Sequence, residues 1–97
     1  MNNEEIEHFI DCLTYEDCTI MLYNRLYWCL GITYDSKEEC CDMLIYEEDV
    51  KTHVYVRTIF DYTSNSCEDC MQHFLYDKYW DGKSFFEIAP DMEWVDL

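Results

Sequence analysis

The chain has 97 residues, of which 22 are acidic and six are Lys or Arg, and its formal net charge is −16 at pH 7. A charge of this size disfavours direct binding to nucleic acid or to an anionic membrane surface. Its length suits one domain with a single core, so we expect residues 1–97 to form one domain. Disordered acidic chains lack aromatic residues, whereas this chain has three Trp, nine Tyr and five Phe, which favours a folded protein.

The sequence shows no targeting or membrane-spanning signal. The longest apolar run has about 13 residues and includes Asn24 and Arg25, which is too short for a span of about 20 residues. The first residues, MNNEEIEHF, lack the basic and apolar regions of a signal peptide. We therefore expect a soluble, cytoplasmic protein.

The first predicted element is an amphipathic helix over residues 3–13, capped by Asn2 or Asn3. Its apolar residues recur at the spacing of one helical stripe, and its acids take the opposite face. The apolar stripe consists of Ile6, Phe9, Ile10 and Leu13. The acids of the outer face include Glu4, Glu7 and Asp11.

The stretch from Cys18 to Tyr34 contains no Asp or Glu, and most of it is apolar. Thr14 precedes it as a possible helix cap, and Gly31 follows Leu30 at a position where helices often end in a left-handed residue. A helix that is apolar around most of its circumference is covered by its neighbours. We therefore predict a central core helix over residues 15–30.

The rest of the chain predicts a mixture of helices and strands. Ser36 and Glu39 form a capping pattern before a third predicted helix, residues 37–48. Residues 50–62 alternate in a way that predicts a strand, with a helix as the competing interpretation. Ser66 caps a fourth predicted helix that ends at Gly82, residues 84–89 predict a second strand, and Trp94 is expected to dock on the core. The predicted elements are about four helices and a two- or three-stranded antiparallel sheet, in a mostly helical α+β domain, with an all-α domain as the alternative.

The seven cysteines are expected to be reduced thiols that pack as small apolar side chains, with a disulfide framework as the alternative. Cys67 and Cys70 form the only CxxC pair. Together with Cys40 and Cys41 they supply the four ligands that a zinc site needs. Adjacent cysteines are poor co-ligands because no turn separates them, so these four residues are weak metal candidates and we expect no cofactor.

The chain contains none of the common catalytic motifs. A nucleophile elbow, a P-loop, a Gly-rich nucleotide loop and an HExxH motif are all missing from the sequence. Carboxylates occur everywhere, so they give no signal of acid–base chemistry. We expect a protein that is not an enzyme.

Acidic residues at helical spacing suggest a binding surface instead. Carboxylates three or four positions apart on a helix lie roughly 5–6 Å from one another, which is similar to the spacing of phosphates along a DNA strand. We predict that two such ridges bind the basic nucleic-acid channel of a partner protein, with solubility alone as the alternative reason for the acidity. The predicted ridges are Glu4, Glu7 and Asp11, and Glu38, Asp42 and Glu48.

In length, charge, aromatic content and lack of catalytic motifs, the chain resembles the small acidic inhibitors that phages and mobile elements make against host defence. Anti-CRISPR and anti-restriction DNA mimics are examples. The resemblance implies a stoichiometric inhibitor that occupies the nucleic-acid-binding surface of a basic host protein or nucleoprotein complex, such as a CRISPR effector. An acidic protein–protein adaptor, an antitoxin-like partner of a basic toxin and a small Cys-rich metal-binding module are the alternatives.

Overall fold

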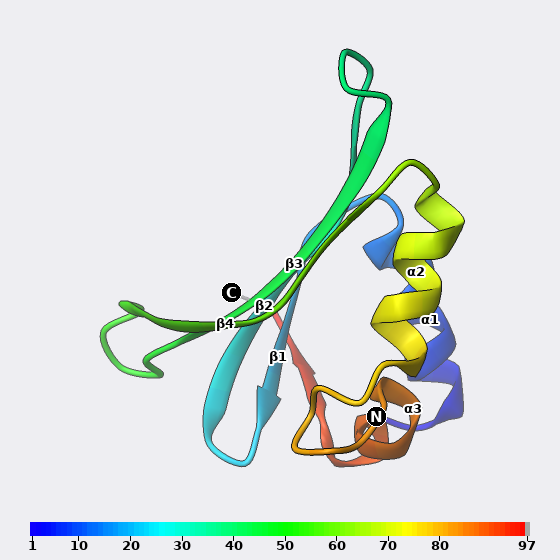
Figure 1. The fold of residues 1–97 in the computed structure, drawn as a ribbon. Coiled ribbons are helices and arrows are strands. Elements are labelled where there is room, and N and C mark those ends of the chain that lie inside the picture. Colours follow the sequence, from blue (N-terminus) through cyan, green and yellow to red (C-terminus); the bar gives the residue numbers. More distant parts are fainter. Residues whose placement is uncertain (97) are drawn as a thin grey trace.

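Five antiparallel strands form one sheet in the order β4-β3-β2-β1-β5, and three short helices pack on one side of it (Figure 1). This computed structural model describes residues 1–96. The sheet dominates the fold, so the prediction of a mostly helical domain is wrong, and so is the all-α alternative. The elements are α1 (Asn3–Leu13), β1 (Cys18–Leu22), β2 (Arg25–Asp35), β3 (Cys40–Glu48), β4 (Tyr55–Ser64), α2 (Cys67–Tyr76), α3 (Phe85–Ile88), the 3-10 turn η1 (Ala89–Asp91) and β5 (Glu93–Val95).

The predicted core helix, residues 15–30, is instead the hairpin of β1 and β2. Tyr23 and Asn24 have φ angles of 50° and 63°, as the two central residues of a tight hairpin turn require. Both strands are interior strands of the sheet and carry apolar side chains on both faces. The apolar character was predicted correctly, but a short apolar run does not distinguish a buried strand from a buried helix.

The predicted third helix, residues 37–48, is also wrong, because this segment is the β2–β3 turn followed by β3. The Asp35 carboxylate accepts a hydrogen bond from the backbone N–H of Lys37 at 2.9 Å and closes the turn. Along β3 the residues are buried at every second position, which is the period of a strand. The capping pattern of Ser36 and Glu39 therefore lies in a turn and starts no helix.

The two remaining helical predictions were correct in type, and the strand predictions were mixed. Asn2 caps α1, and Ser66 caps α2, which ends at Tyr76 rather than at Gly82. The strand predicted over residues 50–62 is present, but it begins and ends further along the chain, as β4 (Tyr55–Ser64). The strand predicted over residues 84–89 is wrong, because Ser84 and Glu87 form a capping box that starts α3.

The core lies between the sheet and the helices. The Phe9 and Phe74 rings of α1 and α2 lie 5.7 and 5.0 Å from the ring of Phe85 in α3, and all three side chains are fully buried. Trp94 of β5 meets Phe9 edge-on at 5.3 Å, so the predicted docking of the tail is confirmed.

None of the helices within residues 1–96 is long and apolar enough to cross a bilayer.

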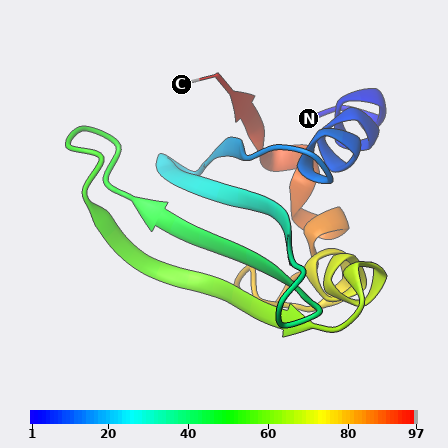
Figure 2. The ribbon, with the colours of Figure 1, turned by 90° about the horizontal axis from the view of Figure 1, so that it is seen from above.

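The helices leave the other side of the sheet free. Figures 1 and 2 show α1 and α2 on the same side, and within residues 1–96 no helix lies on the opposite side. We call this opposite side the open face. Strand alternation and register place these residues on it: Thr19, Met21, Leu26, Trp28, Leu30, Asp42, Leu44, Tyr46, Glu48, Tyr55 and Asp61.

Candidate functional site

Most of the carboxylates are exposed, and nearly all of them lack a basic partner. Among residues 1–96, only Glu47 lies within 4.0 Å of an Arg or Lys nitrogen, from Arg25 and Arg57. Asp69 and Asp77 contact His73 instead. Unpaired charge of one sign destabilises a compact chain by self-repulsion, and it creates a field that attracts a basic partner.

The first predicted acidic ridge lies on α1. Glu4, Glu7 and Asp11 are all exposed and face away from the core. Glu5 between them has a structural role, because its carboxylate accepts a hydrogen bond from the backbone N–H of Asn2 at 3.1 Å. The ridge belongs to the outer side of the helical layer, away from the open face.

The second predicted ridge does not exist, because its residues lie in a turn and a strand. Glu38 is exposed in the β2–β3 turn, Asp42 is half-buried in β3, and Glu48 is buried although exposure was predicted. Asp42 and Glu48 point to the open face, where they border apolar side chains instead of extending a line of charge.

An apolar and aromatic cluster occupies the centre of the open face. Leu26 is only 2% exposed although no helix covers it, because neighbouring side chains on the same face surround it. Trp28 and Tyr46 lie directly opposite each other on β2 and β3. The rings of Tyr46 and Tyr55 are 6.1 Å apart. We call this cluster the aromatic patch, and its members are Met21, Leu26, Trp28, Tyr46 and Tyr55.

The aromatic patch also contains polar groups. The indole Nε1 of Trp28 is covered and has no hydrogen-bond partner within residues 1–96. Burial, followed by the nearby charges of Glu48 and Asp17, raises the pKa of Tyr46. The Tyr46 hydroxyl can donate a hydrogen bond, as aromatic residues of interface cores often do.

A hollow of about 380 Å³ lies beside the aromatic patch, where the register between β2 and β3 shifts after Leu30. Leu30 and Leu44 form apolar walls, and Asp42 and Asp61 are its charged residues. We call it the acidic hollow. Lys and Arg side chains combine an aliphatic stem with a cationic end, so they match apolar walls that carry carboxylates.

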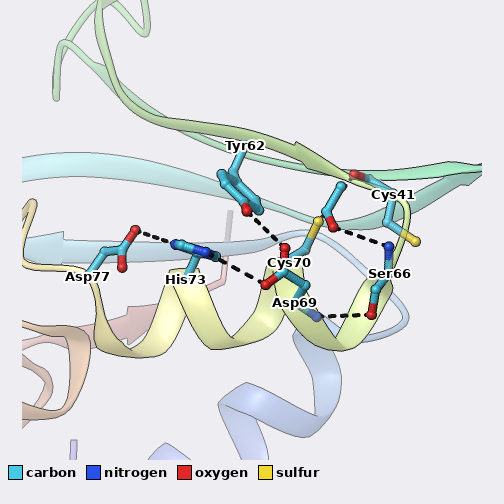
Figure 3. A network of polar contacts seen from close by, with 8 residues as sticks. Cys41, Tyr62, Ser66, Asp69, Cys70, His73 and Asp77 are labelled. Atoms are coloured by element: carbon cyan, nitrogen blue, oxygen red, sulfur yellow. Dashed lines mark hydrogen bonds and ion pairs between the residues drawn. The ribbon is translucent and has the colours of Figure 1, made fainter.

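Three of the four candidate zinc ligands, Cys41, Cys67 and Cys70, meet where β3 contacts the first turn of α2. Figure 3 shows Cys41 and Cys70. Cys41 and Cys67 form a disulfide, with their Cα atoms 5.3 Å apart, so the prediction of seven free thiols is wrong. The Cys70 thiol lies 3.1 Å from the Cys41 carbonyl oxygen, while Cys40 is at the alternate strand position. Within residues 1–96, no three His, Cys, Asp or Glu side chains are grouped so that they could hold a metal ion.

A polar network beside these cysteines joins α2 to β4 (Figure 3). His73 Nδ1 lies 2.8 Å from Asp77 and its Nε2 lies 3.6 Å from Asp69. Its ring stacks on Tyr62 at 4.1 Å, and the Tyr62 hydroxyl donates to Asp69 at 2.8 Å. Burial raises the pKa of the adjacent Cys70 thiol, which disfavours the nucleophilic thiolate. These groups satisfy one another, as in a network that holds a helix on a sheet.

Several residues of the open face were not singled out from the sequence. Trp28 lies within the predicted core helix, residues 15–30, and Leu44 lies within the predicted third helix, residues 37–48. Asp61 received no role. The alternation of Asp42, Leu44, Tyr46 and Glu48 with buried neighbours has period two and was the available signal.

Together these features define a small acidic domain whose antiparallel sheet is covered by helices on one side only. No protein-family model matches the chain, and searches of curated proteins and of solved structures likewise found no match. The fold and its surfaces are therefore the basis for inferring the function.

Proposed function

We propose that this chain is a non-catalytic inhibitor that binds a basic, nucleic-acid-binding host protein with its open face and blocks access of nucleic acid. The observation that carries the proposal is the aromatic patch on an uncovered sheet face, bordered by unpaired carboxylates. Interface cores are enriched in aromatic residues and have a polar rim, and Tyr and Trp contribute much of the binding energy.

The charge of this face selects the kind of partner. Proteins that bind nucleic acid neutralise phosphates with Lys and Arg. The acidic hollow offers such a side chain two carboxylates, from Asp42 and Asp61, and apolar walls for its stem. A partner surface that is occupied in this way is no longer available to phosphate.

The exposed acids of α1 have a different role in this proposal. Glu4, Glu7 and Asp11 lie away from the aromatic patch, so they contribute through the long-range field. Such a field accelerates encounter with a basic protein, whereas desolvated contacts at the centre of an interface determine how slowly the complex dissociates.

The partner class in this proposal is a host defence nucleoprotein, such as a CRISPR effector or a restriction complex, in the cytoplasm of the host cell. Cytoplasmic reductants keep most protein thiols reduced. The Cys41–Cys67 disulfide joins β3 to α2, while the open face is held together in either redox state by the hydrogen bonds between β3 and its neighbouring strands.

A competition assay tests the proposal. The purified chain is added to guide-loaded CRISPR effectors and to restriction endonucleases, each carrying fluorescent target DNA, and the anisotropy of the DNA is followed. We expect stoichiometric release of DNA from at least one of these proteins, weakened by added salt. Hen lysozyme, a basic protein without a nucleic-acid channel, is the control for charge alone. Equal affinity for lysozyme and for every defence complex would show that the acidity is not specific.

A further inference from the structure

A second cavity, of about 370 Å³, lies on the helical side of the sheet. It opens between the β1–β2 turn, the beginning of β4, and the loop that follows α2. Two of the six basic residues of this acidic chain, Arg25 and Arg57, line it. Their placement in one cavity contrasts with the rest of the surface, where carboxylates predominate.

The arginines are positioned by a single buried carboxylate. Glu47 is 8% exposed and its Oε1 lies 2.9 Å from Nε of Arg57 and 4.0 Å from Nη1 of Arg25. Arg57 uses only its Nε in its contact with Glu47, which leaves its terminal N–H groups for other partners. Both arginine side chains are about half exposed, at 50% and 56%.

The charges at the cavity select a ligand of low charge. Arg25 and Arg57 carry two positive charges, of which Glu47 balances one. Asp81 also lines the cavity and repels a second negative charge on a ligand. A singly charged carboxylate fits this balance better than a phosphate dianion, and guanidinium groups bind carboxylates with paired hydrogen bonds.

The rest of the wall is apolar, aromatic and rigid. Trp80 is 4% exposed and meets the ring of Tyr27 edge-on at 5.2 Å. A tight turn fixes it, because its backbone exchanges hydrogen bonds of 3.1 and 3.2 Å with Lys83. Its indole Nε1 is buried and has no acceptor within residues 1–96. Ile59 and Ile88 complete an apolar surface beside the ring.

We infer that this cavity binds a small organic carboxylate, whose charged end lies on Arg25 and Arg57 and whose flat apolar group lies against Trp80. Small-molecule sites place a few convergent polar groups beside apolar surface, and volumes of about 300–1,000 Å³ are usual. The inference does not depend on the proposed function, because the cavity and the open face lie on opposite sides of the sheet.

Phenylacetate is a suitable probe, and ¹H–¹⁵N NMR spectra of the full chain report its position. We expect saturable shifts of the Trp80 indole N–H and the Arg57 Nε–H, with the indole signals of Trp28 and Trp94 unchanged. Phenylacetamide has the same shape without the charge, and inorganic phosphate has charge without the ring. Both are expected to bind at least about tenfold more weakly, which corresponds to about 1.4 kcal/mol.

Two matched variants complete the test. Arg25→Gln removes a guanidinium that makes no hydrogen bond in the fold, so the fold is retained and phenylacetate binding falls about tenfold. Lys37→Gln removes the same charge from the β2–β3 turn and leaves binding unchanged. The inference is overturned if phosphate or phenylacetamide binds as well as phenylacetate, if Arg25→Gln binds normally, or if both variants lose binding equally.

Discussion

His73 contacts two carboxylates, those of Asp69 and Asp77. The hydrogen bond with Asp77, followed by the charges of Asp77 and Asp69, raises its pKa above the ordinary value of 6.5. A group with a raised pKa in the folded state stabilises the fold fully below its unfolded-state pKa, and this contribution is lost as pH rises through the folded-state pKa. The network of Figure 3 is therefore expected to be strongest in mild acid.

The prediction for His73→Gln is a loss of stability that depends on pH. Urea unfolding of the wild type and the variant is compared at about pH 5.5 and about pH 8.5, on either side of the ordinary His value. The difference in free energy of unfolding should be larger at the lower pH. Asp77→Asn removes the main cause of the pKa shift and should show the same trend. A difference that is equal at both pH values would contradict the assigned role of the ion pairs.

Only glycine fits at position 31, because the backbone of another segment passes very close to it. A Cβ atom at this position would lie 2.6 Å from the carbonyl oxygens of both Leu13 and Glu16, and neither can rotate away as a side chain can. The backbone N–H of Gly31 also donates to Asp17 at 2.9 Å. The sequence pattern predicts Gly31 as the end of a helix, but the residue lies inside β2, where its backbone packs against Leu13 and Glu16.

Gly31→Ala is therefore expected to destabilise the fold by about 1–3 kcal/mol, as overpacking of a filled site does. Chemical unfolding monitored by Trp fluorescence measures the change. At Gly82, which has a φ of +82°, an added Cβ meets no atom within 4 Å, so Gly82→Ala isolates the cost of backbone strain alone. If Gly31→Ala unfolds at the same denaturant concentration as the wild type, the close approach is incorrect.

At the scale of elements, the Cys41–Cys67 disulfide joins β3 to α2 across a sequence separation of 26 residues. Closing a loop of this length stabilises a fold by about 3–4 kcal/mol in the chain-entropy description. Thiol titration of the denatured, unreduced chain should find five reactive groups, because the other five cysteines are free. Reduction should raise the count to seven and lower the melting temperature. Seven thiols without reductant would show that the bond does not form.

The helices could be predicted where amphipathic spacing and caps coincide. α1 combines an apolar stripe with Asn2 as its cap, and α2 starts directly after Ser66. The strands β1 and β2 could not be separated from a helix, because both faces of each strand are apolar. Their turn also lacks the Asn-Gly or Asp-Gly pair that usually marks a hairpin, since Tyr23 and Asn24 occupy it at positive φ.

At the scale of the whole molecule, composition predicted the charge of the surface but not its arrangement. The helical spacing of the α1 acids predicts that they are exposed, and in the structure they are exposed. The open face depends on which strands are neighbours, which the sequence does not state. Asp42 and Asp61 come from different strands, yet both line the acidic hollow, because β3 and β4 pair side by side.

The uncovered sheet face and the unpaired carboxylates together favour an interaction protein. A sheet face that carries a Trp, two Tyr and a buried Leu without a covering layer is unusual for a free surface and typical of an interface core. With a Debye length of about 8 Å at physiological salt, charges near this face act on the partner in the proposed complex, while those on α1 act mainly during encounter.

The most direct test of this account is the kinetics of binding to a nucleoprotein that the competition assay identifies. Asp61→Lys places a positive charge in the acidic hollow, and Glu7→Lys makes the same change on α1; both residues are exposed, so the fold is retained. We predict that Asp61→Lys speeds dissociation at least about tenfold and restores DNA binding, whereas Glu7→Lys slows association only and loses its effect as salt is raised. Equal inhibition by wild type and Asp61→Lys, or binding that does not respond to salt, would contradict the account.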